Sequence, residues 1–179
     1  KLILYASSSS VYGECNEFPY SEKNYKIKPI SLYGVTKKFK KDLAYSYNKL
    51  FKMNCIGLRF FTVYGPWGRP DMALFKFVKN IKNNKSIDVY NNGKHHRSFT
   101  YISDITDAIK LLLEKYINEN ISINEVLNIG GDKSINLLDF IKIIEQKLGL
   151  KAKINYLPKQ LGDIEKTESD CSKIQSLVA

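Results

Sequence analysis

Cysteine, arginine and long apolar runs are all scarce in this sequence of 179 residues. Its cysteines, Cys15, Cys55 and Cys171, show no CxxC or other ligand-like spacing, which argues against a disulfide framework and a metal site. Its apolar runs, such as residues 2–6, fall far short of the roughly 20 residues that span a bilayer. The first residues also lack the pattern of a signal peptide. We therefore expect a protein of a reducing, cytoplasmic compartment, without a metal or a membrane span.

The shortage of arginine qualifies the high net charge of +10. Among 28 basic residues, only Arg59, Arg69 and Arg97 are arginine, although proteins that read nucleic acids rely on arginine for bidentate contacts. The lysines are scattered along a chain that also holds 20 Ile and 15 Asn, which indicates compositional bias. A basic nucleic-acid binder, with steeply salt-dependent binding, is therefore a disfavoured alternative. A phosphorylated small molecule is the better partner for a few arginines.

Hydrophobic residues at 44% and charged residues at 26% are typical of one globular domain. Apolar runs predict strands over residues 2–6, 55–61, 86–90, 98–102, 125–129 and 152–156. Helical periodicity appears over residues 31–52, 72–83, 103–116 and 137–148, with Ser103 and Asn136 as expected N-caps and Gly149 as a stop. Strands that alternate with helices indicate an α/β fold with a largely parallel sheet.

Two features suggest how the chain is divided. The loop at residues 65–70 is rich in glycine and proline, and we expect the chain to pass there from one subdomain to another. The sequence opens on Lys1 and enters an apolar strand at once. Because a buried strand at a free end would be an unprotected edge, we expect this sequence to be a fragment.

Ser8, Tyr33 and Lys37 form the first candidate site. Tyr33 and Lys37 are four residues apart, hence on one helical face, where a cation stabilises a phenolate. Such a tyrosine is a competent general base for a sugar hydroxyl. Ser8 follows the first strand, at the edge where parallel sheets bind ligands. YxxxK alone is common, so an ordinary helix surface is the competing interpretation.

Five longer blocks extend this pattern: Ala6–Gly13 followed by Tyr33 and Lys37, Leu58–Pro66, Trp67–Phe75, Ser86–Tyr90 and Arg97–Asp104. These blocks resemble the extended short-chain dehydrogenase/reductase family, and within it the UDP-glucuronate 4-epimerases. They cover nearly the whole chain in order. The resemblance implies part of a Rossmann-like parallel sheet, its C-terminal strands and helices, with a smaller α/β substrate-binding subdomain. Residues 1–65, with later elements near 98–116, would belong to the NAD-binding domain, and residues 66–179 mainly to the UDP-sugar-binding subdomain.

The resemblance assigns catalytic and cofactor roles to particular residues. Tyr33 would be the base, Lys37 its activator and a ligand of the nicotinamide ribose, and Ser8 the third catalytic residue. The other residues expected near NAD are Ala6, Ser7 and Phe60. A proton would leave the C4 hydroxyl while hydride passes to NAD, and the 4-keto sugar would take hydride back on its other face. Sugar 4,6-dehydratases carry Asp-Glu where this sequence has Ser9 and Ser10, so dehydration is disfavoured.

The resemblance also assigns the substrate-binding residues, which are Ser9, Ser10, Thr62, Arg69, Val89, Tyr90, Arg97 and Asp163. Arg69 would pair with the C6 carboxylate, a bidentate match that lysine cannot make, and Thr62 is the residue that glucuronate enzymes carry. Arg97 would bind the diphosphate, Val89 and Tyr90 would line the uracil pocket, and Asp163 would take a ribose hydroxyl. Gln160 departs from the arginine of many relatives, which puts one phosphate contact in doubt.

Several of these residues have structural interpretations too. Phe60, Val89 and Tyr90 could be core residues, and Arg59 is expected to be structural. Asp104 and Asp107 suit the dipole of a helix start. His95 and His96 follow an Asn-Gly turn and are expected at the surface.

The alternatives are a UDP-glucose or UDP-N-acetylhexosamine 4-epimerase, and a UDP-sugar-binding remnant without chemistry. The glycine-rich GxxGxxG turn that seats the pyrophosphate of NAD is not in this sequence. We therefore expect these 179 residues alone to be inactive and unstable, and the whole protein to be an active, homodimeric epimerase of polysaccharide biosynthesis.

Overall fold

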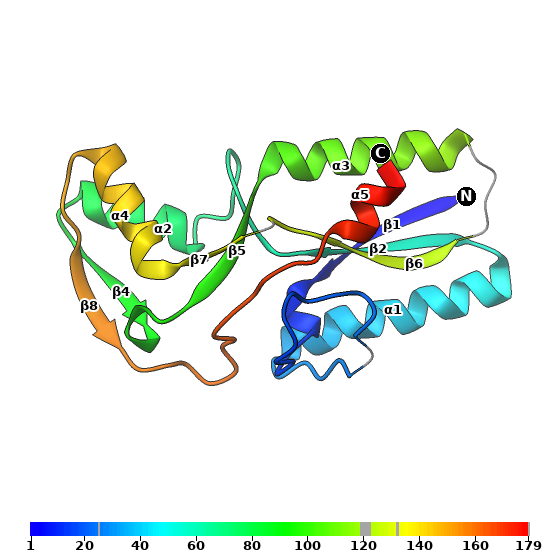
Figure 1. The fold of residues 1–179 in the computed structure, drawn as a ribbon, viewed down its shortest axis with the longest axis horizontal. Coiled ribbons are helices and arrows are strands. Elements are labelled where there is room, and N and C mark those ends of the chain that lie inside the picture. The colour runs from blue at the N-terminus through cyan, green and yellow to red at the C-terminus, as the bar shows by residue number, and fades with distance from the viewer. Residues whose placement is uncertain (25, 119–122, 132, 179) are drawn as a thin grey trace.

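The computed structural model describes residues 1–24, 26–118, 123–131 and 133–178. Figure 1 shows two lobes linked by long strands. The first lobe holds strands β1 (Leu2–Ser8), β2 (Asn54–Phe60) and β6 (Asn124–Ile129), with helices α1 (Leu32–Phe51), α3 (Ile102–Asn118) and α5 (Ser172–Val178). The second holds strands β4 (Ser86–Tyr90) and β8 (Lys153–Leu157) with helices α2 (Ala73–Lys82) and α4 (Leu137–Leu148).

The sheet of the first lobe is parallel in the order β1-β2-β6. Helix α1 lies on one face, and α3 and α5 lie on the other (Figure 1). The central strand β2 is buried from Cys55 to Arg59, as expected for a strand covered on both faces. Ile56, Leu58, Leu112 and Leu127 form the core beneath α3 and α5. This rigid layer fixes the carboxyl ends of β1 and β2, where the candidate site begins.

Helix α1 begins at a side-chain cap and ends in a left-handed residue. The Oγ atom of Ser31 accepts a hydrogen bond from the backbone N–H of Gly34 at 3.0 Å, and Lys52 follows the last turn with φ +53°. Only Gly34 and Ala44 are buried in this helix. Its remaining apolar side chains, Phe39 among them, are largely exposed.

The second lobe has its own core. Phe77, Ile81, Ile87, Val89 and Ile141 are buried where α2 and α4 pack against β4 and β8. A third sheet, in the order β3-β5-β7, runs between the lobes from β3 (Thr62–Tyr64), β5 (His96–Tyr101) and β7 (Ser134–Asn136). Strand β5 leads directly into α3, so it joins the second lobe to the first (Figure 1).

The α/β prediction is confirmed, as is every predicted helix, although some local expectations are wrong. Strand β1 is an outer strand among the described residues, and Ile3 is 39% exposed rather than buried. Ser103 lies inside α3, which begins one residue earlier, and it donates a hydrogen bond to Asp104 instead of capping. The turn η2 (Asn91–Gly93) follows β4, and β4 pairs with β8. Within the described residues, none of the helices has the length and apolarity to span a bilayer.

Candidate active site

A cleft of about 560 Å³ lies where the two lobes meet. It is lined by Ser8, Ser9, Ser10, Ser31, Tyr33, Phe61, Thr62, Arg69, Met72, Arg97, Gly162, Asp163, Ile164 and Thr167. These residues come from the carboxyl end of β1, the first turn of α1, strands β3 and β5, and the segment between β8 and α5. The cleft therefore combines residues that are up to 159 positions apart.

Ser8 ends β1 and caps the short turn η1 (Ser9–Val11). Its Oγ atom accepts a hydrogen bond from the backbone N–H of Ser10 and donates one to the Ser10 hydroxyl, both at 3.2 Å. The Ser8 residue is 7% exposed, so its orientation is set by these local bonds. A serine held in this way can present its hydroxyl to a ligand at fixed geometry.

Gly34 brings Tyr33 close to this serine cluster. A Cβ atom at Gly34 would lie 2.7 Å from the carbonyl oxygen of Ser10 and 2.8 Å from the Cβ of Pro29. Only glycine permits so close an approach of α1 to η1. Tyr33, one residue earlier, remains 52% exposed on the wall of the cleft. Sequence reasoning missed Gly34, although its position between the tyrosine and the lysine was visible.

Lys37 lies one turn beyond Tyr33 and is anchored to β1. Its Nζ atom donates a hydrogen bond to the carbonyl oxygen of Ala6 at 3.2 Å and lies 5.3 Å from the centre of the Tyr33 ring. The ammonium group is thus fixed between the strand end and the phenol. An ammonium has three N–H donors, and this contact uses one of them.

The residues after β2 divide between core and cleft. Phe60 packs against the core of the first lobe, while Phe61 and Thr62 line the cleft. Arg59 is structural, as expected: it is 2% exposed and donates a hydrogen bond to the Tyr12 hydroxyl at 2.9 Å. Burial raises the pKa of Tyr12 to about 12, so this phenol stays a neutral donor to Asn128.

Arg69 reaches the cleft from the loop after β3, and it already has a carboxylate partner. Its Nε and Nη2 atoms donate to the two carboxylate oxygens of Asp71 at 2.9 and 2.6 Å. The hydrogen bonds from Arg69 hold the pKa of Asp71 below its usual range. The guanidinium therefore shows the fork geometry that a ligand carboxylate would need.

Arg97 and Asp163 form the opposite wall. The Arg97 Nη2 atom donates to Asp163 Oδ1 at 3.0 Å, and its Nη1 atom donates to the carbonyl oxygens of His96 and Glu165. Burial lowers the pKa of Arg97, an effect that Asp163 partly offsets. A guanidinium has five N–H donors, and these three hydrogen bonds leave capacity for an anion in the cleft.

His95 contradicts its expected surface position. It is 4% exposed, and its Nε2 atom lies 2.8 Å from Asp163 Oδ2. The segment between β8 and α5 covers it, since Glu165 accepts a hydrogen bond from the backbone N–H of His96 at 2.9 Å. The Asn-Gly turn before His95 could not predict this burial, because the covering segment around Asp163 lies some 70 residues later in the sequence.

Val89 and Tyr90 lie outside the residues that line the cleft. Val89 is fully buried in the core of the second lobe, so it presents no surface to a ligand in this structure. Tyr90 is half-buried at the end of β4. A neighbouring hollow of about 680 Å³ shares Asp163 and Ile164 with the cleft but holds neither Ser8 nor Tyr33. We therefore place the candidate chemistry in the smaller cleft.

Comparison with known proteins gives these groups a context. The sequence profile of the NAD dependent epimerase/dehydratase family matches residues 1–130. A probable UDP-glucuronate 4-epimerase of Rhizobium meliloti is 38% identical over 191 residues, which cover 99% of this chain and 56% of that protein. The chain thus spans about half the length of this relative.

Solved structures agree with the sequence comparison. The UDP-glucuronic acid 4-epimerase of Bacillus cereus, in complex with UDP-glucuronic acid and NAD, matches with a TM-score of 0.90 and 36% identity, over 99% of this chain and 55% of that one. The UDP-N-acetylglucosamine 4-epimerase of Methanobrevibacter ruminantium, in complex with UDP-N-acetylmuramic acid, matches with a TM-score of 0.88 and 27% identity, over 100% of this chain and 57% of that one. These matches confirm the predicted Rossmann-like fold class.

Proposed function

The chain belongs to the NAD-dependent epimerase/dehydratase family, and on this premise we propose that its protein is a nucleotide-sugar 4-epimerase that interconverts UDP-glucuronate and UDP-galacturonate. One observation carries the proposal. Ser8 and Tyr33 meet Arg69, Arg97 and Asp163 across a single cleft. A general base thus faces cations suited to a carboxylate and a diphosphate.

The residues at the end of β1 fit NAD as the cofactor. Lys37 is held by the Ala6 carbonyl with N–H donors to spare, which suits the hydroxyls of the nicotinamide ribose. Ala6 and Ser7 lie at the carboxyl end of a parallel strand, where nucleotides bind in such sheets. When bound there, NAD would supply the hydride acceptor and donor at C4 that epimerisation through a 4-keto sugar requires.

The residues of the chain manage the proton and the position of the sugar. The phenol oxygen of Tyr33, next to the Lys37 ammonium, takes the proton of the C4 hydroxyl and later returns it. Ser8 hydrogen-bonds the same hydroxyl and keeps it aimed at Tyr33. Ser9, Ser10 and Thr62 line the sugar end of the cleft.

The two arginines divide the charges of the substrate. Arg97 binds the diphosphate, Asp163 accepts from a ribose hydroxyl, and Arg69 exchanges Asp71 for the C6 carboxylate. Tyr90 borders the uracil with Val89 beside it in β4, and Phe60 lies near the nicotinamide.

The proposal extends to organisation and place. Residues 1–65, with elements near 98–116, belong to the NAD-binding domain, and residues 66–179 mainly to the domain that binds the UDP-sugar. The whole protein acts as a homodimer in the cytoplasm, where its product is used for polysaccharide synthesis. These 179 residues alone are inactive.

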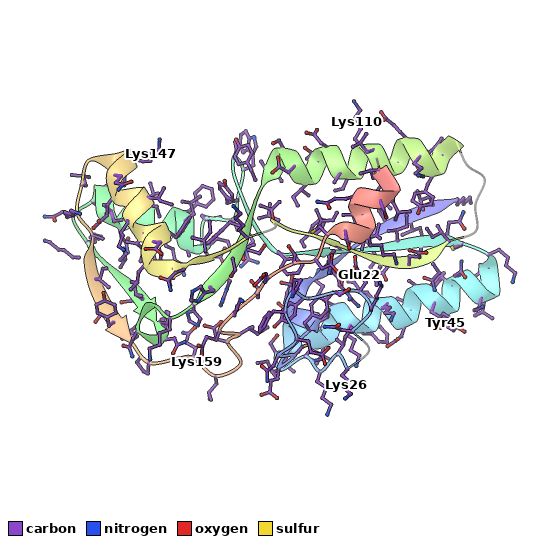
Figure 2. The ribbon with its side chains drawn as sticks, in the orientation of Figure 1. Glu22, Lys26, Tyr45, Lys110, Lys147 and Lys159 are labelled. Atoms are coloured by element: carbon purple, nitrogen blue, oxygen red, sulfur yellow. The ribbon has the colours of Figure 1, made fainter. Side chains whose placement is uncertain are left out.

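Replacing Tyr33 by phenylalanine tests the function. In the native protein that carries this chain, we expect Tyr33→Phe to lower kcat for UDP-glucuronate by about 10²- to 10⁴-fold, the usual contribution of a general base. Formation of UDP-galacturonate is followed by chromatography. Tyr45→Phe is the matched control, because Tyr45 is 54% exposed on the outer side of α1 (Figure 2). Equal activity of the two variants would remove Tyr33 from the mechanism.

A second candidate is an epimerase of neutral UDP-sugars such as UDP-glucose or UDP-N-acetylhexosamines. It is favoured by the Arg69–Asp71 pair, which occupies the guanidinium proposed to bind the substrate carboxylate. The ratio of kcat/KM for UDP-glucuronate and UDP-glucose decides between the two. Binding of UDP-sugars with no turnover of either would indicate a binding protein without chemistry.

A further inference from the structure

His95 is a buried titratable group that the proposed mechanism does not use. Its residue is 4% exposed, and its Nε2 atom lies 2.8 Å from Asp163 Oδ2. Despite this short distance, the angle between the two groups does not meet the geometry of a hydrogen bond, and Nε2 has no other hydrogen-bond partner among the described residues. The other carboxylate oxygen of Asp163 accepts from Arg97 at 3.0 Å. Asp163 is therefore shared between a permanent cation and a group that can become one.

The charges around His95 come from three parts of the chain. Strand β5 contributes Arg97, whose charge opposes protonation of His95. The segment between β8 and α5 contributes Lys159, which also opposes it, and Asp163 and Glu165, which favour it. Lys159 lies on that segment beside the second lobe in Figure 2. The first turn of α4 packs on the His95 carbonyl, and its Asp139 is engaged by Lys142.

Burial is the largest influence and lowers the pKa of His95 below 6.5. At pH 7 the imidazole is therefore neutral, and the Arg97–Asp163 pair has a net charge of zero. Protonation of His95 places a positive charge next to Asp163, so less of the carboxylate charge is left to neutralise Arg97. A dianionic diphosphate in the cleft then meets a net cation, and Coulomb attraction to it increases.

We propose that His95 is a positioning residue which, through Asp163, sets how much positive charge Arg97 presents to the diphosphate of a UDP-sugar. The proposal rests on the proposed function of the cleft. It makes UDP-sugar binding tighter as pH falls, because the bound dianion favours the protonated imidazole and binding takes up a proton. A rise of one unit in the pKa of His95 on binding corresponds to about tenfold tighter binding at low pH.

The test measures the Kd of UDP-glucose between pH 5.5 and pH 8 by titration calorimetry, in the native protein that carries this chain. UDP-glucose is the probe because its diphosphate is a diester, with no proton to gain in this range, and because it lacks the carboxylate that would involve Arg69. We expect the Kd to fall several-fold, and by no more than about tenfold, from pH 8 to pH 5.5, with proton uptake detected by changing the buffer.

Two variants test whether the pH dependence of the Kd comes from the His95 imidazole. His95→Gln keeps an N–H donor for Asp163 but cannot gain charge, so its Kd should be nearly independent of pH and close to that of the native protein at pH 8. His96→Gln is the matched control, since His96 is the adjacent histidine but makes no ion pair among the described residues, and it should keep the full pH dependence. Thermal unfolding at each pH shows that the variants are folded.

Each result decides the question. A pH-independent Kd in the native protein, or a pH dependence that survives in His95→Gln, would overturn the role of His95 while leaving epimerisation intact. Failure to bind UDP-glucose at any pH, together with failure to turn over UDP-glucuronate, would overturn the proposed function and this inference with it.

Discussion

At the scale of single residues, the cleft depends on ion pairs whose partners a substrate must replace or share. Arg69 and Asp71 are both well exposed and linked by two hydrogen bonds. Their pair is weak because water competes at the surface. It is therefore suited to exchange, since a bound carboxylate can take the place of Asp71 at little cost.

This exchange predicts opposite effects for the two partners. Arg69→Ala should raise the KM for UDP-glucuronate about tenfold or more while leaving UDP-glucose nearly unchanged, because only the uronate brings a carboxylate. Asp71→Asn should lower the KM for UDP-glucuronate about 2- to 5-fold, since the internal competitor loses its charge. Steady-state kinetics with both substrates measure this. A parallel change for both sugars in either variant would contradict the exchange.

The pH range of that measurement follows from the same pair. Arg69 holds the pKa of Asp71 below its usual range, so Asp71 stays ionised throughout pH 6–8. Loss of the pair by protonation belongs to more acidic solutions, where the carboxyl gains its proton. The difference between Asp71→Asn and the native protein should therefore be constant across pH 6–8.

At the scale of elements, the contact between α1 and η1 sets the distance between Tyr33 and Ser8. The contact depends on Gly34, where a Cβ would come within 2.7 Å of the Ser10 carbonyl. Backbone cannot move aside as a side chain can, so α1 must shift to accept a methyl group.

Gly34→Ala should lower kcat by at least about tenfold, because a small shift of a general base costs much of its effect. Its free energy of unfolding should fall by up to about 2 kcal/mol, because a strain of about 1–3 kcal/mol is only partly offset by the roughly 1 kcal/mol that alanine contributes to a helix. Val35→Ala, at a neighbouring position that is 50% exposed, should keep normal activity. Kinetics and urea unfolding of both variants provide the measurement. Full activity in Gly34→Ala would show that the contact does not position Tyr33.

Some of these elements could be predicted from the sequence and others could not. Helix α4 was predictable end to end, since Asn136 accepts from the Leu138 N–H and Gly149 ends the helix with φ +65°. Strand β7 was not predicted, because three residues carry no readable periodicity. The burial of His95 was missed for a different reason: it depends on Glu165 and Asp163, which reach it only through tertiary structure.

At the scale of the whole molecule, the site is completed by the segment between β8 and α5, which crosses both lobes. Its Glu165 and Thr167 pair with His96 of β5, and its Glu168 and Asp170 pair with Tyr20 in the loop after β1. Asp163 lies on this segment and lines the cleft. The chain therefore closes its candidate site with residues that lie far from Tyr33 in sequence.

The outer face of α1 is an apolar surface that the described residues leave uncovered. The exposed side chains follow helical spacing, with Phe39 61%, Leu43 45%, Leu50 74% and Phe51 63% exposed. A soluble monomer rarely exposes such a continuous stripe. A second copy of α1 would cover it symmetrically, as in a two-fold dimer.

Reversing the character of this stripe tests the dimer. We expect the native protein to have the mass of a dimer in light scattering, and Phe39→Asp with Leu43→Asp to have that of a monomer, because two buried carboxylates would have no partners. Lys110→Asp, on α3 across the sheet from α1, is the control and should remain dimeric (Figure 2). The double variant should also lose activity, because Tyr33 begins the same helix and its position depends on how firmly α1 is held. A native protein that is monomeric at micromolar concentration would contradict the dimer.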